Sequence, residues 1–353
     1  IMVDTLTNEA VELLQKMISI PSFSREEKER ADFLEFYLQA KGYDVFRNKN
    51  NIWLISPGFS PLRPTLLLNS HIDTVKPGND WTLNPFEPKI ENGKLYGLGS
   101  NDAGASVVSL LSAFLYLIQQ NQSYNLIFAA TAEEEISGEN GIECLLEEFP
   151  PIDFAIVGEP TEMKMAVAER GLMVLDCIAR GKSAHAGREE GENAIYKAIK
   201  DIEWFRTYQF PKQSDFLGAV KMTVTQIAGG TQHNVIPDKC TFVVDVRSNE
   251  LYTNEEILEI IREHVHCEVE PRSIRLCSSN VQLDHPIITR ARELHLDLFG
   301  SPTLSDQALM PFPSVKIGPG DSARSHTANE FIELNEIEKG IQIYIQLLDG
   351  LKW

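Results

Sequence analysis

The sequence predicts an α/β protein in which a mainly parallel mixed sheet, flanked by helices, is interrupted by a smaller two-layer α+β domain. The length of 353 residues suits about two domains, since a domain has roughly 150 residues. Continuous apolar runs in the first half are typical of parallel strands that are buried on both faces. These runs are Thr65–Asn69, Asn125–Ala130 and Asp153–Val157. Later in the chain, strand patterns mixed with helical ones indicate the second, smaller unit.

The first third of the chain begins with helices. Ser24 and Glu27 have the spacing of a capping box, which predicts a helix that ends before Gly42. The longest uncharged apolar stretch is Ala103–Ile118. Because it is shorter than the roughly 20 residues that cross a bilayer, we expect a buried helix and no membrane partner.

The middle of the chain predicts a strand–helix–strand–strand–helix order. The expected strands are Leu172–Ile178, Val220–Ile227 and Cys240–Val246. Apolar residues from Ile195 to Phe205 recur at helical spacing, and Thr253 with Glu256 forms a second capping box. From about Val281 the chain returns to helix, a strand at Ser314–Ile317 and a final helix. We therefore expect a first domain in two parts, 1–167 and 279–353, and an inserted domain at 168–278.

The net charge of the chain excludes some classes of binding partner. With 32 basic and 51 acidic residues, the net charge is -19. Such a chain repels phosphate backbones and anionic membranes, so we expect neither as a partner. It attracts metal cations instead. The five cysteines are scattered, without a C-x-x-C motif, which fits reduced thiols in the cytoplasm.

Potential metal ligands follow each of the three buried runs. His71 and Asp73 follow the first, Glu133-Glu134-Glu135 the second and Glu159 the third. Taken singly, each is as well explained by a surface turn, a solvated loop or a helix cap. In parallel sheets, however, ligands gather at the carboxyl ends of the strands. The coincidence of three such ends predicts one shared site.

Two further residues extend this set. Asp102 ends the turn Gly97-Leu98-Gly99-Ser100-Asn101-Asp102, and His326 follows a glycine-rich turn. A structural turn and a structural histidine are the simpler interpretations of each alone. Together with the strand-end residues, they form a nitrogen and oxygen ligand set suited to two Zn²⁺ ions about 3.5–4 Å apart.

Three candidates for substrate contacts lie in the middle segment. His185 is surrounded by small residues in Gly181–Gly187, Asn234 lies in another glycine-rich segment, and Arg247 ends a predicted strand. A histidine in such a turn can stabilise an oxyanion, and a guanidinium can bind a carboxylate through two hydrogen bonds. Ordinary loop chemistry explains each of them equally well.

At this point the motifs resemble a known family, the dinuclear zinc hydrolases that include acetylornithine deacetylase, succinyl-diaminopimelate desuccinylase and aminoacylase. The matching motifs, which occur in the family's order over nearly the whole chain, are S-H-I-D-T-V (70–75), G-x-G-x-x-D (97–102), T-A-E-E-E (131–135), V-G-E-P-T (157–161), G-x-S-A-H-A (181–186), N-V-I-P (234–237), D-V-R (245–247) and H-T-A-N-E (326–330). Each motif is modest alone, whereas eight in order are specific. The resemblance implies a zinc exopeptidase-like catalytic domain with an inserted dimerisation or lid domain.

The resemblance also implies residue roles. Asp102 would bridge two Zn²⁺ ions, with Co²⁺ or Mn²⁺ as substitutes. The ligands that complete the two sites would be His71 and Glu159 for one ion, and Glu135 and His326 for the other. Glu134 would be the general base, and Asp73 the partner of the His71 ring. In a homodimer, His185 would act across the interface, and Asn234 and Arg247 would hold the substrate.

Within this family, the compact length and the segment Gly320–His326 most resemble the deacetylase branch. We therefore expect the hydrolysis of an N-acyl amino acid, foremost N-acetylornithine, or N-acetylcitrulline or N-acetyl-lysine, in arginine biosynthesis. Three alternatives stay open. They are desuccinylation of succinyl-diaminopimelate or of a succinylated ornithine or citrulline, dipeptidase or carboxypeptidase activity, and a non-catalytic protein that binds an amino-acid derivative.

Overall fold

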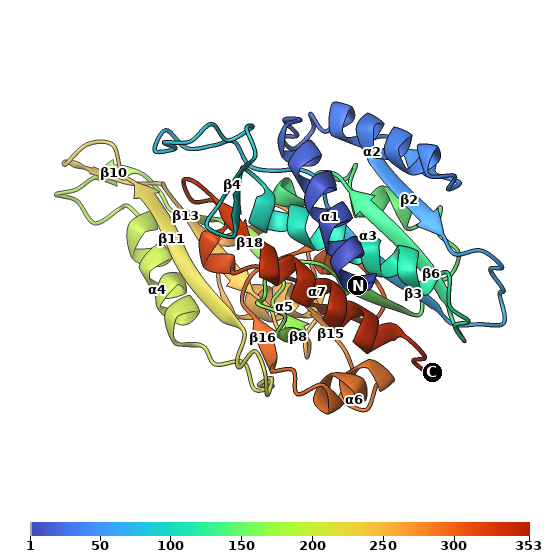
Figure 1. The fold of residues 1–353 in the computed structure, drawn as a ribbon. Coiled ribbons are helices and arrows are strands. Elements are labelled where there is room, and N and C mark those ends of the chain that lie inside the picture. Colours follow the sequence, from blue (N-terminus) through green and yellow to red (C-terminus); the bar gives the residue numbers. More distant parts are fainter. Residues whose placement is uncertain (1) are drawn as a thin grey trace. The chain divides into compact units, whose positions relative to one another are not determined.

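The computed structural model describes residues 2–353, and the chain forms two compact units. The larger unit extends to Val167 and continues with 280–299 and 305–353. The inserted unit comprises 168–279 and 300–304. Each is described by itself below, and Figure 1 gives the order of their elements along the chain.

The larger unit is built on a nine-stranded sheet with the order β1-β2-β6-β3-β7-β17-β8-β15, in which β16 also pairs with β8. Its strands are β1 (Phe46–Asn48), β2 (Asn51–Ile55), β3 (Thr65–His71), β6 (Asn125–Thr131), β7 (Phe154–Val157), β8 (Met165–Glu169), β15 (Ser279–Asn280), β16 (Leu298–Ser301) and β17 (Ser314–Lys316). Strands β6, β3, β7 and β17 are mutually parallel, whereas β2 and β8 pair antiparallel. Every residue of these four parallel strands is buried. The predicted fold class is thus confirmed.

Helices cover this sheet. They are α1 (Met2–Ile18), α2 (Lys28–Ala40), α3 (Ala105–Leu117), α6 (Pro286–Glu293) and α7 (Leu334–Leu348). Helix α3 contacts β3, β6, α1 and α7, and Figure 1 shows these three helices side by side. Because it is covered on all sides, nearly every residue of α3 is buried, which confirms the buried helix expected there.

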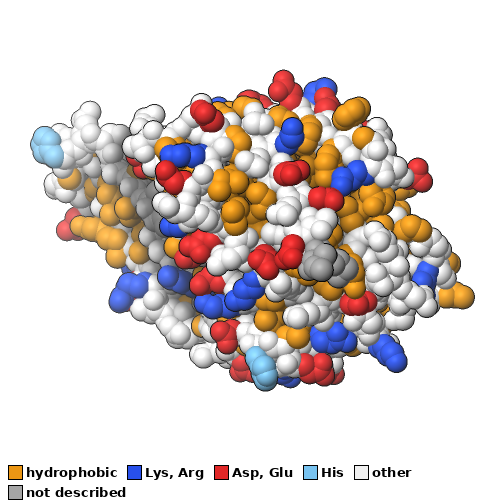
Figure 2. All heavy atoms as spheres, in the orientation of Figure 1, with side chains coloured by type: hydrophobic (Ala, Val, Ile, Leu, Met, Phe, Trp, Pro, Cys, Tyr) orange, Lys and Arg blue, Asp and Glu red, His pale blue; other side chains and the backbone are white. Residues whose placement is uncertain are grey.

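Short helices and a small sheet lie in the segments that connect the main strands and helices. They are η1 (Ser100–Gly104), η2 (Glu134–Ile136), η3 (Ile142–Leu145), η4 (Asp306–Leu309), η5 (Ser322–Arg324) and a small antiparallel sheet of β4 (Lys89–Glu91), β5 (Lys94–Tyr96) and β18 (Phe331–Glu333). From Met2 to the last residue, no helix is both long and apolar enough to cross a membrane. Figure 2 shows acidic and basic side chains interspersed over the face that carries α1 and α7.

The inserted unit is a four-stranded antiparallel sheet with two helices. Its sheet has the order β11-β13-β9-β14, formed by β9 (Met173–Arg180), β11 (Lys221–Gly229), β13 (Lys239–Arg247) and β14 (Glu268–Pro271). The helices are α4 (Ala194–Thr207) and α5 (Asn254–His264), and a short ribbon pairs β10 (Ala184–His185) with β12 (Val235–Ile236). Burial alternates along β9 and β13, so their inward side chains share one core with the helices. This is a two-layer α+β arrangement.

The two predicted capping boxes have different outcomes. Thr253 and Glu256 form theirs, since each side chain accepts the other's backbone N–H, at 3.1 and 2.8 Å. The box of Ser24 and Glu27 is wrong, because α2 begins only at Lys28. The Ser24 hydroxyl instead donates to the Asp73 carboxylate at 2.7 Å.

Candidate metal centre

The parallel strands explain why the predicted ligands meet. Strand β3 lies between β6 and β7, and all three run in the same direction. His71 is the last residue of β3, while Glu134 and Glu135 follow β6 and Glu159 follows β7. Their side chains therefore emerge at one edge of the sheet, on both sides of His71.

Two loops bring the remaining predicted ligands to this edge. Asp102 lies in η1, directly before α3, in a turn opened by Gly99 at φ 76°. His326 follows η5 and has a left-handed backbone with φ 58°. That conformation is uncommon for a residue with a side chain, and here it belongs to a residue of the cluster.

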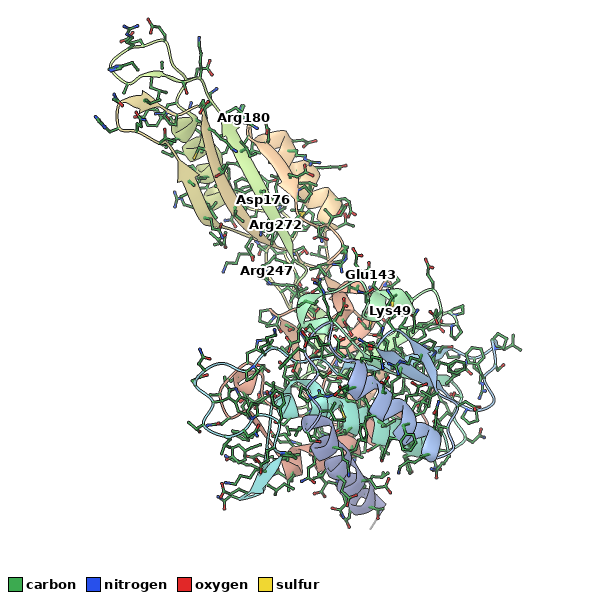
Figure 3. The ribbon with its side chains drawn as sticks, turned by 90° about the horizontal axis from the view of Figure 1, so that it is seen from above. Lys49, Glu143, Asp176, Arg180, Arg247 and Arg272 are labelled. Atoms are coloured by element: carbon green, nitrogen blue, oxygen red, sulfur yellow. The ribbon has the colours of Figure 1, made fainter. Side chains whose placement is uncertain are left out.

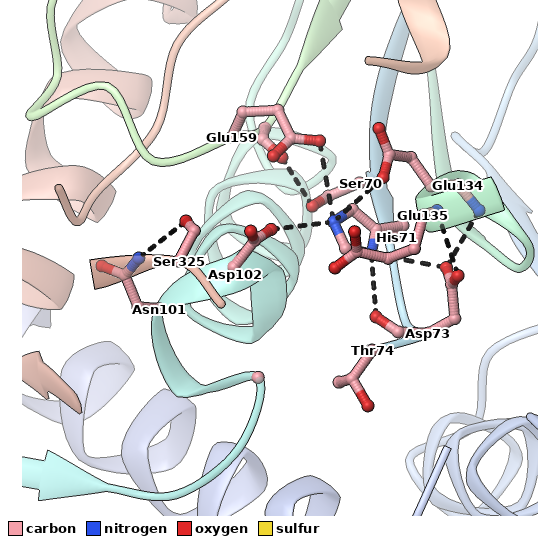
Figure 4. Close-up of polar contacts among 12 residues, drawn as sticks. Ser70, His71, Asp73, Thr74, Asn101, Asp102, Glu134, Glu135, Glu159 and Ser325 are labelled. Carbon is pink, nitrogen blue, oxygen red and sulfur yellow. Dashed lines mark hydrogen bonds and ion pairs between the residues drawn. The ribbon is translucent and has the colours of Figure 1, made fainter. Parts of the chain in front are cut away.

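Figure 4 shows four of the five predicted ligands, and ligand atoms within 4.8 Å of one another form two groups, His71 with Asp102 and Glu135, and His71 with Glu134 and Glu159. The Asp102 oxygens face different histidines: Oδ1 is 3.2 Å from His71 Nε2, and Oδ2 is 3.5 Å from His326 Nε2. Glu159 Oε1 lies 3.7 Å from His71 Nε2, and Glu135 Oε2 lies 3.0 Å from His326 Nε2. His71 is thus common to both groups, and the Asp102 carboxylate lies between the two histidines.

Burial and crowding shift the pKa values of these acids. Burial, opposed by His71 and assisted by neighbouring carboxylates, raises the pKa of Glu134 and of Glu159 well above the usual range. For Asp102, burial acts to raise the pKa, but the hydrogen bond and charge of His71, with Ser325 and His326, together lower it. The hydrogen bond to Glu135 raises the pKa of His326 to about 9. Several buried carboxylates thus lie close together around the two imidazoles.

This donor set fits divalent cations. Glu159 Oε1 is buried and has no hydrogen-bond partner, although it points at His71. A buried carboxylate oxygen without a partner is costly unless a cation or proton meets it. Imidazole and carboxylate ligands suit zinc and similar ions, and one carboxylate oriented toward both histidines suits a pair of them.

Asp73 organises the residues around His71. Its carboxylate accepts the backbone N–H of Glu134 at 3.0 Å and of Glu135 at 3.2 Å. The His71 ring nitrogen Nδ1 lies 2.9 Å from the Asp73 carbonyl oxygen and 3.4 Å from its carboxylate. The backbone carbonyl, rather than the expected carboxylate, is therefore the nearer partner of the ring.

The triple glutamate separates into inward and outward residues. Glu133 adopts a left-handed backbone with φ 56°, and its side chain accepts hydrogen bonds from Asn140. Glu134 and Glu135 follow in η2 and face the cluster, with Glu134 Oε2 at 3.7 Å from His71 Nε2. The turn thus directs two of three consecutive acids inward, which sequence spacing alone does not decide.

Sequence reasoning gave no role to three charged residues beneath the cluster. Asp306 accepts hydrogen bonds from Asn69 and Thr131, both at 2.8 Å, and burial raises its pKa to about 6. Glu330 and Arg30 are also buried, at 2% and 3% exposure. Only Glu330 carried a signal, as the last residue of the H-T-A-N-E motif.

In the inserted unit, two of the three predicted substrate contacts lie together and the third lies apart from them. His185 and Asn234 are exposed and adjacent, because β10 pairs with β12 and the Ala186 N–H donates to the Asn234 carbonyl at 2.9 Å. Arg247 lies at the far end of β13, and Figure 3 shows it well away from Arg180 along the sheet. Nine strand residues span roughly 26 Å, so His185 and Arg247 of one chain do not converge. The Arg247 guanidinium meets Asp245 at 2.8 and 3.1 Å.

The fold and the acid–histidine cluster define an α/β metallohydrolase. The model of peptidase family M20/M25/M40 matches residues 67–350, so the chain belongs to this family. The resemblance seen in the sequence is confirmed, and the protein is an enzyme of this metallohydrolase family.

Two curated relatives cover nearly the whole chain. A succinyl-diaminopimelate desuccinylase from Wolbachia pipientis is 26% identical, with 96% of this chain and 92% of the relative aligned. A [LysW]-lysine/[LysW]-ornithine hydrolase from Sulfurisphaera tokodaii is 29% identical, with 96% and 95% aligned.

Solved structures share the fold. Aminopeptidase PepT from Bacillus cereus matches with a TM-score of 0.76 at 23% identity, covering 98% of both chains. A dinuclear metal-binding peptidase of the M20 family from Bacillus subtilis matches with a TM-score of 0.74 at 16% identity, again over 98% of both chains.

Proposed function

We propose that the protein is a deacylase of N-acyl amino acids that uses two Zn²⁺ ions, with Co²⁺ or Mn²⁺ as substitutes. The observation that carries this proposal is the orientation of Asp102, whose two carboxylate oxygens face His71 and His326 separately. In the proposal, Asp102 bridges both ions. His71 and Glu159 complete one site, and Glu135 and His326 complete the other.

Glu134 is the proposed general base. When bound, the two ions activate a water molecule and polarise the amide carbonyl. Glu134 lies beside His71 and is not needed to complete either proposed ligand set. Its carboxylate accepts a proton from the attacking water and then donates it to the leaving amine. Asp73 holds the Glu134 backbone N–H and the His71 ring during these steps.

The proposed substrate is an N-acetylated amino acid, foremost N-acetylornithine, with N-acetylcitrulline and N-acetyl-lysine next. The name of the Sulfurisphaera relative supports an ornithine or lysine product. Desuccinylation is the second candidate, because the Wolbachia relative is named for succinyl-diaminopimelate. Both candidates break a linear amide bond to an amino acid, and they differ in the acyl group. A place in arginine biosynthesis follows from the first candidate alone.

A substrate panel tests this proposal. Purified protein with Zn²⁺ is assayed against the N-acetyl and N-succinyl forms of ornithine, citrulline, lysine and diaminopimelate, and against a dipeptide, with a chelator as control. We expect N-acetylornithine to show the highest kcat/KM and the chelator to abolish turnover. A preference for succinyl substrates or for the dipeptide contradicts the acetyl assignment. Metal and ligand binding without any hydrolysis points to a non-catalytic binding protein.

The variant Glu134→Gln tests the general base. Its amide keeps the size of the side chain but cannot accept the proton, so kcat should fall by about 10²–10⁴-fold. Elemental analysis should find the same metal content as in the wild type, because Glu134 is not a proposed ligand. A variant with full turnover contradicts the role, and a variant without metal makes Glu134 a ligand instead.

We also propose a homodimer formed through the inserted unit, with the larger unit catalytic. Strand β11 is an edge of its sheet and exposes Ile227, while α4, which contacts β11, exposes Tyr196 and Ile199. Unpaired edges with exposed apolar side chains favour pairing with another chain. Figure 2 shows such side chains at the left, where Figure 1 places α4 and β11.

A dimer also accounts for the separation of the predicted substrate contacts. Because His185 lies far from Arg247 in its own chain, the proposal places the His185 of one copy at the substrate of the other. At that substrate, the His185 imidazole stabilises the oxyanion. Asn234 and Arg247 hold the substrate. For Arg247 to bind a substrate carboxylate, its pairing with Asp245 has to open or be shared. The cytoplasmic location expected from the cysteines stays a prediction.

A further inference from the structure

Glu330 anchors the turn that carries Asp102. Its Oε1 accepts the backbone N–H of Asn101 at 2.9 Å and of Asp102 at 2.8 Å, and its Oε2 accepts that of Gly99 at 2.9 Å. The Glu330 carbonyl accepts a fourth N–H, from Gly97, at 3.0 Å. One buried side chain therefore fixes the backbone on both sides of Ser100 and up to Asp102.

The same short segment supplies a ligand and this anchor. His326 faces Asp102 Oδ2 at 3.5 Å, and Glu330 follows it by four residues. Between them, the Asn329 side chain accepts the backbone N–H groups of Thr82 and Leu83, at 3.1 and 2.9 Å. Asn329 and Glu330 thus tie the C-terminal end of this segment to the fold, and Glu330 links the segment that carries His326 to the turn that carries Asp102.

A buried cation balances the anchor. Arg30 donates to the carbonyls of Ile72 and Ile20, at 2.8 and 2.7 Å. Burial lowers the pKa of Arg30 to about 10, although Asp73 and Glu330 both act to raise it. The guanidinium is therefore charged at neutral pH, and it lies within electrostatic reach of Asp73, which accepts the Glu134 and Glu135 N–H groups, and of Glu330, which accepts that of Asp102. This arrangement offsets the cost of burying Glu330 close to the ligand acids.

We propose that Glu330 is a positioning residue that fixes the Asp102 carboxylate so that it binds both metal ions at once. The inference rests on the proposed function, in which Asp102 is the shared ligand. Without the anchor, the Asp102 backbone can move, and its two oxygens no longer face the two histidines together. Loss of Glu330 should then weaken the pair of ions more than it weakens the fold.

The test compares Glu330→Gln with a matched control, Asp201→Asn. The Asp201 carboxylate is also buried and accepts two backbone N–H groups, of His266 and Cys267, but it lies in the inserted unit. Mn²⁺ alone is titrated into the metal-free full chain, and electron paramagnetic resonance reports both free Mn²⁺ and exchange coupling between bound ions. Thermal melting reports the stability of each variant.

We expect two coupled Mn²⁺ ions in the wild type and in Asp201→Asn. In Glu330→Gln, affinity for the second ion should fall by about 10–100-fold and the coupling should weaken, as for other losses of residues that orient ligands. Glu330→Asp keeps the charge but shortens the reach, so an intermediate loss is expected. This second variant also serves if the first does not fold.

Three outcomes overturn the inference, and they differ. A folded Glu330→Gln or Glu330→Asp with wild-type affinity and coupling shows that Asp102 needs no such anchor, and leaves the proposed function intact. A wild type that takes up no coupled pair of ions refutes the proposed metal centre and the inference with it. Equal losses of affinity in Asp201→Asn also count against the inference, because the effect then follows from stability alone.

Discussion

Two histidines show how local environment sets the protonation of the same side chain. Although burial lowers it, the pKa of His71 is raised well above the usual range by Glu134, Glu159 and other carboxylates. His285 instead stacks on Phe154 at 4.4 Å, and burial lowers its pKa, although Asp284 acts to raise it. The first environment suits a cation-binding site, and the second favours a neutral ring.

His285 should make the fold sensitive to acid. The unfolded chain protonates histidine near pH 6.5, whereas the folded chain resists protonation, so stability is lost as the pH falls through that value. In His285→Asn this loss should be absent, while asparagine can still cap α6 as His285 does through the Ile287 N–H. Urea unfolding at about pH 8 and about pH 5 gives the unfolding free energy of the wild type and of His285→Asn. A constant difference in unfolding free energy between them contradicts the prediction.

At the scale of elements, helix starts depend on whether the cap residues have stronger partners elsewhere. The Thr253 side chain accepts the Glu256 N–H, and the capping box of these two residues forms. Ser24 and Glu27 have the same spacing, but Ser24 binds Asp73 and the Glu27 carboxylate accepts the N–H groups of Arg25 and Glu133. The N-terminal segment before α2 therefore supports the metal centre and not the helix.

The capping box of α5 should contribute measurably to stability. Thr253→Ala removes the acceptor of the Glu256 N–H, which typically costs about 1 kcal/mol in unfolding free energy. Hydrogen exchange should become faster in the first turn of α5 before it changes elsewhere in the inserted unit. Thr231→Ala, in an exposed loop, is the control and should leave both measurements unchanged. Equal effects of the two substitutions contradict a specific role of the cap.

At the scale of the whole molecule, the proposed activity depends on a second copy. The larger unit holds the acid–histidine cluster, whereas His185 and Asn234 belong to the inserted unit, at the end of its sheet remote from Arg247. An edge strand with exposed apolar neighbours is available on that unit. Symmetric pairing of two copies uses the same patch twice, which is the commonest way in which soluble chains assemble.

The oligomeric state tests this arrangement. Sedimentation velocity at micromolar concentration should give about twice the mass of the 39.7 kDa chain. Ile227→Arg places a charge on the β11 edge and should shift the protein to monomer with a loss of turnover. Leu62→Arg changes a fully exposed leucine of the larger unit and should leave the mass and turnover unchanged. A wild type that sediments as a single chain contradicts the dimer.

Much of the candidate site was predictable because its residues follow recognisable local patterns. His71, Glu134, Glu135 and Glu159 come directly after buried apolar strands, and Asp102 ends a glycine-rich turn. Asp306 and Arg30 were not predictable, since an isolated acid or arginine carries no pattern. Thr131 and Asn69, the partners of Asp306, lie 175 and 237 positions away in the chain.

The sequence by itself determined the buried strands, the amphipathic elements and the ligand-bearing segments, because hydrophobic periodicity and turn residues are local properties. Only the tertiary structure decided that β3 lies between β6 and β7, that Glu133 turns away while Glu134 and Glu135 turn inward, and that Glu330 holds the Asp102 turn. Those outcomes depend on strand order and on hydrogen bonds between distant segments. Such bonds form only where the folded chain excludes water and leaves each buried polar group to find a partner.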